Sequence, residues 1–339
     1  MREKDVHITK PKGPLGAEMG KRGVGFGRRA THVLAIASAL VFAAASASWA
    51  DGILTPAGPV ANAMTTHFWQ VVWISMIVVV PVLIGVPWIA WHYRYGNNKA
   101  TYKPQWDFDH ALEAAMWVVP AIIVAVLAVL LWDGTHKLDP YKPLASKEKP
   151  VQVEVVGLDW KWLFIYPEYH IATVGVLAFP QDRPVQMKLT TDTVMQSFLI
   201  SALGGQIYAM PGMVTQLNLA ADKVGHFDGY NTQYTGDGFH DQHFTAVSMS
   251  KGDFDTWLKE VQKDGVALNP MAYNKLAASS TPDQVHAVFG NRAMPAHVTY
   301  FNDVPSGLFT SIVKRYNSGK PVLAADQPGT TAYNAKYSN

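Results

Sequence analysis

The sequence contains no cysteine among its 339 residues. This absence excludes a disulfide framework, an iron–sulfur cluster, a zinc ribbon and a thiolate nucleophile, because each of these needs cysteine sulfur. It also excludes a lipid-modified cysteine as a membrane anchor. An excess of charge of one sign is missing too: the formal net charge is +2, too small for the basic patch of a nucleic-acid-binding protein. We therefore expect no nucleic-acid partner.

Two long runs carry no aspartate, glutamate, lysine or arginine, and they extend from Phe68 to Trp91 and from Ala114 to Trp132. Each is long enough to cross a hydrocarbon core of about 30 Å. Tryptophans near their ends are typical of membrane interfaces. The sequence therefore predicts transmembrane helices at 67–93 and 111–133.

Positive charge predicts the orientation of this hairpin. The connecting segment 94–110 carries Arg94, Lys99 and Lys103, whereas the segment 51–66 has no lysine or arginine. The positive-inside rule puts such a connection in the cytoplasm. Segment 51–66 and everything after the second helix are then extracytoplasmic.

The first fifty residues have the composition of a secretory signal. A basic region ends in Arg28-Arg29, an apolar stretch covers 33–47, and small residues follow. We predict that 1–50 is a signal segment that is cleaved, and the alternative is an uncleaved third membrane helix.

Beyond a proline-rich linker at 134–150, apolar residues alternate with polar ones. Val151, Val153 and Val155 begin this pattern, which is typical of antiparallel strands in a sandwich. We predict a β-sandwich at 151–252, an aromatic-rich helical region at 253–318 and a disordered tail at 319–339. The dense aromatic segment around Trp160 and Trp162 is interpreted as a core strand.

Two groups of ionisable residues invite a functional reading. His226, His240 and His243 share a loop region with aspartates, but no metal-binding spacing supports a metal site there, and we do not predict one. Glu113 stands just before the second uncharged run, where it either belongs to a proton pathway or begins the helix at the interface.

Three segments carry a family resemblance: VVGLDWKWLFIYPEYHIATV, QSFLISALGGQIYAMPGM and FNDVPSGLFTSIVKRY. Together with the hairpin and the β-domain, they resemble subunit II of haem-copper terminal oxidases and, within that family, the bo-type ubiquinol oxidases. The resemblance covers the chain from about Ile53 to Lys320. It implies a membrane-anchored, cupredoxin-like sandwich.

In the cytochrome c oxidase branch this domain binds a binuclear copper centre, and the resemblance locates its ligand positions here. The two bridging cysteines fall on Asn231 and Thr235, the histidines on Gln196 and Phe239, the methionine on Gln242, and the glutamate that binds through its backbone carbonyl on Gln233. Such a site needs thiolate sulfur and imidazole nitrogen. We therefore expect no copper, no other metal and no catalytic residue in this chain.

The resemblance also implies the partners. The haems and one copper are expected in subunit I, and ubiquinol in the bilayer is the expected substrate in place of cytochrome c. The chain would join subunits I, III and IV in the inner membrane of a bacterium, with its β-domain in the periplasm. It would serve as a structural subunit of a proton-pumping oxidase that reduces oxygen to water. The alternatives are a cytochrome c oxidase subunit and a membrane-tethered sandwich used for binding or assembly.

The segment LEAAMWVVP matches the family segment whose glutamate lies at the mouth of a proton pathway. The resemblance therefore implies that Glu113 contributes to proton entry.

Overall fold

The computed structural model describes residue 52 and residues 54–97 and 105–338. The predicted signal segment, 1–50, lies outside the described residues. Of the predicted connection 94–110, residues 98–104 also lie outside the described residues.

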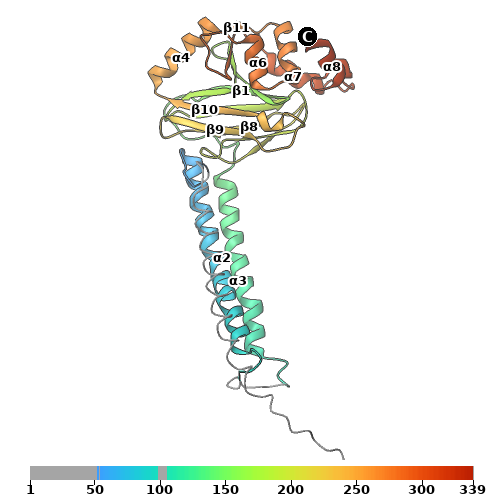
Figure 1. Ribbon diagram of the computed structural model, residues 1–339. Coiled ribbons are helices and arrows are strands. Elements are labelled where there is room, and N and C mark those ends of the chain that lie inside the picture. Colours follow the sequence, from blue (N-terminus) through green and yellow to red (C-terminus); the bar gives the residue numbers. More distant parts are fainter. Residues whose placement is uncertain (1–51, 53, 98–104, 339) are drawn as a thin grey trace, which may run out of the picture. The chain divides into compact units, whose positions relative to one another are not determined.

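Two long helices follow the N-terminal segment (Figure 1): α2 (Pro59–His92) and α3 (His110–Lys137). Both are long and apolar enough to cross a membrane, and large apolar side chains along them are exposed, such as Trp73 and Trp117. Apolar surface on this scale is stable against lipid rather than water. Each helix extends beyond the uncharged run that predicted it.

The β-domain contains two sheets. The seven-stranded sheet has the order β11-β12-β3-β2-β1-β5-β8, and the five-stranded sheet has the order β4-β10-β9-β6-β7. The strands of the first are β11 (Val266–Ala267), β12 (Thr299–Asn302), β3 (Ile171–Val174), β2 (Lys161–Tyr166), β1 (Val151–Leu158), β5 (Val185–Thr191) and β8 (Thr215–Leu219). Those of the second are β4 (Val176–Pro180), β10 (His243–Met249), β9 (Gly225–Asn231), β6 (Gln196–Leu199) and β7 (Ile207–Ala209).

The alternation in the sequence matches the burial of β1. Val151, Val153 and Val155 are buried, whereas Gln152 and Glu154 between them are half-buried. The expectation of antiparallel pairing throughout was wrong. The pairs β1–β5, β4–β10 and β11–β12 are parallel. A period of two reports which face of a strand is buried but not the direction of the neighbouring strand.

Aromatic side chains fill the space between the two sheets. The ring of Trp162 on β2 meets Phe198 on β6 edge-on, with 5.2 Å between ring centroids, and Phe198 stacks on Phe244 of β10 at 5.0 Å. All three are buried. Trp162 is therefore core, as we predicted, but Trp160 is half-buried and lies in the turn between β1 and β2, outside the strand.

A second hydrophobic core covers the other face of the seven-stranded sheet, where Leu163 and Ile165 pack with residues such as Phe309 and Ile312 from the C-terminal region. Figure 1 shows these helices, coloured orange to red, stacked beyond β1. They are α4 (Lys251–Asp264), α5 (Pro270–Ala277), α6 (Pro282–Phe289), α7 (Leu308–Tyr316) and α8 (Thr331–Tyr337), with the short 3-10 turns η1 (Phe239–Asp241) and η2 (Ala324–Asp326).

The C-terminal boundaries differ from those we predicted. The region 253–318 is not wholly helical, because it supplies β11 and β12 to the seven-stranded sheet. The expected disordered tail at 319–339 contains η2 and α8, and Tyr333 in α8 is buried and donates its hydroxyl hydrogen bond to the backbone oxygen of Asn274 at 3.2 Å. One buried aromatic anchors a segment whose polar composition suggested no core contact.

Candidate functional site

The positions expected to correspond to copper ligands come together at one end of the sandwich. Gln196 opens β6, Asn231 ends β9 and Gln242 immediately precedes β10. All three side chains are buried. Thr235 lies in the connection between β9 and η1 and is half-buried.

Their side chains form a hydrogen-bonded chain of amides. Gln242 Nε2 donates to Gln196 Oε1 at 2.7 Å, and Asn231 Nδ2 donates to Gln242 Oε1 at 2.8 Å. Thr235 Oγ1 donates to the same Gln242 oxygen at 3.3 Å. We call these four residues the amide cluster.

Further bonds to the surrounding chain hold the ends of the amide cluster. Gln196 Nε2 donates to the backbone oxygen of Leu158 at 2.9 Å. Asn231 Oδ1 accepts from the backbone N–H groups of Ser197 and Gln233, both at 3.0 Å. Every side-chain amide oxygen of the cluster thus accepts a hydrogen bond, as buried polar atoms require.

The chemistry of this cluster does not fit copper. Its side chains offer neutral amide and hydroxyl groups, whereas a thiolate-bridged copper centre needs soft sulfur and imidazole ligands. Gly157 completes the packing, because a Cβ built there would lie 2.4 Å from Gln196 Oε1. The Gln196 amide therefore occupies the space beside the backbone of β1.

Two further predicted positions lie at the edge of the cluster. Gln233 contributes only the backbone N–H noted above. Phe239, in η1, makes a ring contact with Tyr234 at 5.7 Å and is not among the residues bonded to the amides. The structure thus brings four of the six positions together through their side chains.

Trp160 covers this loop from the side of β1 and β2. Its Nε1 donates to the backbone oxygen of Thr235 at 3.1 Å, and its ring lies against Gly238, where a Cβ would come within 2.2 Å of the ring. Any larger residue than glycine at 238 would displace the indole. Trp160 is thus bound to the loop that carries the amide cluster.

Lys161, between the two tryptophans, is fully buried, which the sequence did not suggest. Its Nζ donates to the backbone oxygens of Asp159, Ala278 and Ser280 at 2.9–3.0 Å. Burial lowers the pKa of Lys161 to about 7, and the nearby Asp159 carboxylate opposes this shift. The amine joins β2 to the segment after α5.

A buried carboxylate was also missed. Asp192, just after β5, is fully buried and accepts from Arg315 Nη1 at 2.9 and 3.0 Å, from Tyr273 at 2.6 Å and from Tyr316 at 2.9 Å. Burial raises the pKa of Asp192, while the guanidinium and the two phenol donors oppose that rise. The resembling segment FTSIVKRY contained two of these residues, but nothing in it indicated the partner.

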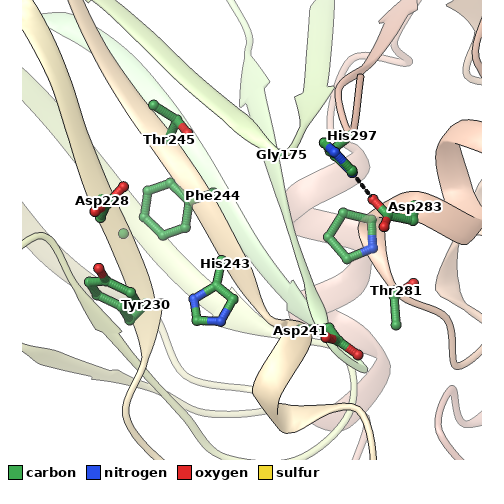
Figure 2. Close-up of a pocket in the computed structure, with 12 residues that line it drawn as sticks. Gly175, Asp228, Tyr230, Asp241, His243, Phe244, Thr245, Thr281, Asp283 and His297 are labelled. Carbon is green, nitrogen blue, oxygen red and sulfur yellow. Dashed lines mark hydrogen bonds and ion pairs between the residues drawn. The ribbon is translucent and has the colours of Figure 1, made fainter. Parts of the chain in front are cut away.

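Figure 2 shows the cavity beside the histidine-containing region, with a volume of about 410 Å³. His243 packs edge-on against the ring of Tyr230, with 5.3 Å between ring centroids, whereas His297 pairs with Asp283 on the α6 side. In the ranges that the structure describes, no three histidine or acidic side chains are close enough together to hold a metal ion.

Glu113 lies in the first turn of α3. Asp109 caps that helix, its Oδ1 accepting from the N–H groups of Ala111 and Leu112 at 3.0 Å. The Glu113 side chain is half-exposed and sits where the positive end of the helix dipole favours a carboxylate.

Comparison with known proteins agrees with this architecture. A family model described as the periplasmic domain of cytochrome c oxidase subunit II matches residues 169–243, a range that contains the whole amide cluster. The cytochrome bo(3) ubiquinol oxidase subunit 2 of Pseudomonas putida is 45% identical over 66% of this chain and 76% of its own.

Two further relatives extend the match. The cytochrome bo(3) ubiquinol oxidase subunit 2 of Pseudomonas aeruginosa is 41% identical over 78% of this chain and 76% of its own. The ubiquinol oxidase subunit 2 of Acetobacter aceti is 41% identical over 79% of this chain and 83% of its own. The resemblance and the fold class that we predicted are confirmed, and the chain belongs to the family of subunit 2 of cytochrome bo(3)-type ubiquinol oxidases.

Proposed function

We propose that this chain is the subunit of a ubiquinol oxidase that holds no redox centre of its own, and that electrons bypass its β-domain. The amide cluster carries this proposal. Its buried amides are hydrogen-bonded to one another, and they lie at the positions that the family resemblance assigns to the copper ligands.

The electron donor follows from where electrons enter. A water-soluble cytochrome reaches an oxidase at the domain surface, so its electrons need a relay in that domain. A quinol dissolved in the bilayer reaches the membrane subunit directly. A copper-free domain therefore fits a quinol donor, with the haems and the remaining copper in subunit I.

The chain would then act in assembly. In this proposal α2 and α3 anchor it in the bacterial inner membrane beside subunits I, III and IV, and the sandwich lies in the periplasm. The complex oxidises ubiquinol, reduces oxygen to water and translocates protons. Neither cytochrome c nor nucleic acid is among its binding partners in this proposal.

Glu113 would contribute to proton entry from the cytoplasmic side. Its support is the match to the family segment and its place in the first turn of a membrane helix, where an ionisable group is rare and tends to be functional. Asp109 already supplies the helix cap, so capping does not require Glu113.

The purified complex tests the proposal. We expect oxygen uptake with ubiquinol, none with reduced cytochrome c, and one copper per complex. Oxidation of cytochrome c, or additional copper with thiolate-to-copper absorption, would show that the β-domain carries electrons. A preparation without haem would instead favour a role in binding or assembly alone.

A further inference from the structure

A cavity of about 410 Å³ lies where the two long helices meet the β-domain. Its walls come from the start of α2 (Val60, Met64), the end of α3 and the linker after it (137–140 and 142–145), the loop before β7 (Gly205, Gln206) and the strand β8. Its size is within the range of ligand pockets. The oxidase role leaves this cavity unexplained.

Backbone hydrogen bonds fix the walls to the sandwich. The N–H groups of Ala57 and Ala61 donate to the backbone oxygens of Ala202 at 2.8 Å and Leu203 at 3.2 Å. Asn218 donates both its N–H, at 3.1 Å, and its Nδ2, at 3.0 Å, to the backbone oxygen of Pro140. The cavity is therefore part of the folded domain.

The cavity also lies at the depth of lipid headgroups. The 28 residues of α3 span about 42 Å at 1.5 Å per residue, whereas a hydrocarbon core is about 30 Å thick. The uncharged run ends at Trp132, so the last turns of α3, which carry Asp133 and Lys137, extend into the headgroup region. Trp132, which is exposed five residues before Lys137, fits the aromatic belt at that boundary.

The lining combines an apolar wall with two lysine side chains. Val60, Met64 and Leu138 are among its apolar residues, and Lys137 and Lys142 supply the cations. Lys137 pairs with Asp133 at 2.8 Å, but the Lys142 ammonium has no bonding partner in the part of the chain that the structure describes.

One carboxylate also lines the cavity. Asp139 accepts the N–H of Tyr141 at 2.9 Å, which engages one of its oxygens within the linker. Together with Asp133, which pairs with Lys137, Asp139 balances the two lysines in number, and among the described residues the Lys142 ammonium is the cation left to contact a phosphate.

We propose that this cavity binds one anionic phospholipid of the adjacent leaflet. Its phosphate contacts Lys142 and Lys137, and the first part of an acyl chain lies against Val60, Met64 and Leu138. The lipid would fill the space between hairpin and sandwich and stiffen the connection. This inference needs only that α2 and α3 span the membrane, so it is independent of the electron donor.

Native mass spectrometry of the delipidated oxidase complex, titrated with phosphatidylglycerol, tests the site. A lysine near the membrane surface contributes about 1 kcal/mol toward an anionic lipid, which corresponds to about fivefold in binding. We expect binding at one site to weaken about fivefold in Lys142→Gln and further in Lys137→Gln/Lys142→Gln. The pair Lys259→Gln/Lys263→Gln, exposed on α4, removes the same charge as a control and should bind like the unaltered complex.

A second variant tests the apolar wall with both lysines intact. Met64→Trp places a larger ring beside Gly205, which Met64 already approaches closely, and we expect it to remove the same binding event. Haem content and far-UV circular dichroism establish that each variant is assembled. Unchanged binding in the double lysine variant or in Met64→Trp, or an equal loss in the α4 control, would overturn the proposal.

Discussion

Gln242 donates through Nε2 to Gln196 Oε1 at 2.7 Å, and both side chains are buried between the sheets. The bond joins the residue before β10 to the first residue of β6. It therefore links two of the positions expected to correspond to copper ligands, on either side of β9 in the five-stranded sheet. Polar residues here stabilise the fold only as long as each has its partner.

Replacing Gln242 by leucine should destabilise the β-domain. The substitution leaves Gln196 Oε1 and Asn231 Nδ2 buried with fewer partners, and each orphaned group is worth about 1–3 kcal/mol. We expect the free energy of unfolding to fall by about 2–4 kcal/mol, measured by chemical denaturation of the full chain in detergent. Gln233→Ala is the control, since Gln233 joins the cluster only through its backbone.

The same Gln242→Leu variant tests whether electrons pass through this domain. If they do not, ubiquinol turnover per haem in the assembled complex stays unchanged. A large loss of turnover would contradict the proposal that electrons bypass the β-domain.

Glu113→Gln should slow oxygen reduction. The amide keeps the shape of the side chain but cannot carry a proton, so a proton-entry role predicts lower turnover with normal assembly and haem content. We also expect Glu113→Ala to be slow and Glu113→Asp to retain much of the rate. Oxygen uptake by purified complexes measures this effect. Asp109→Asn, which preserves a good helix cap, controls for changes at the start of α3, and normal rates in Glu113→Gln would remove the proposed role.

Lys161 should make stability depend on pH. Its pKa is about 7 in the folded chain and 10.5 in the reference state. Between these values the unfolded chain holds a proton that the folded chain lacks, so stability rises with pH, by at most about 1.4 kcal/mol per pH unit. Below pH 7 both states are protonated and this contribution is constant.

We expect unfolding measurements from pH 6.5 to 9 to show this rise in the unaltered chain and not in Lys161→Met. The upper limit avoids the ionisation of unfolded tyrosines, which acts in the opposite direction because burial raises the pKa of Tyr273 and Tyr300. Parallel pH profiles in the two proteins would show that Lys161 keeps its charge when buried.

Arg315→Met should loosen the attachment of α7. It leaves the Asp192 carboxylate buried with only tyrosine donors, and breaking a buried ion pair usually destabilises by 3–5 kcal/mol. Because the Arg315 side chain is 26% exposed, we expect about 3 kcal/mol. Asp192→Asn/Arg315→Met should be less destabilised than the two single losses combined, and Lys314→Met, on the exposed side of α7, should change little. Denaturation of the full-length variants checks both, and additive losses would indicate that the pair is not coupled.

The sequence by itself determined the features that repeat locally along the chain. The uncharged runs around Trp73 and Trp117 predicted the two long helices, since length and absence of charge are sufficient for that inference. The alternation in Val151–Val155 predicted a half-buried strand. The residue types at Gln196, Asn231 and Gln242 already excluded thiolate and imidazole ligands, whatever their geometry.

Only the tertiary structure decided which distant residues meet. Lys161 reaches an oxygen 117 residues away, and Asp192 meets Arg315 across 123 residues. A repeat of two or 3.6 residues relates only close neighbours in the sequence, so it could not indicate either of these contacts. For the same reason the parallel direction of β1 and β5 and the burial of Tyr333 were not predicted: each depends on how the chain returns to the core, and local patterns report burial but not the neighbour that provides it.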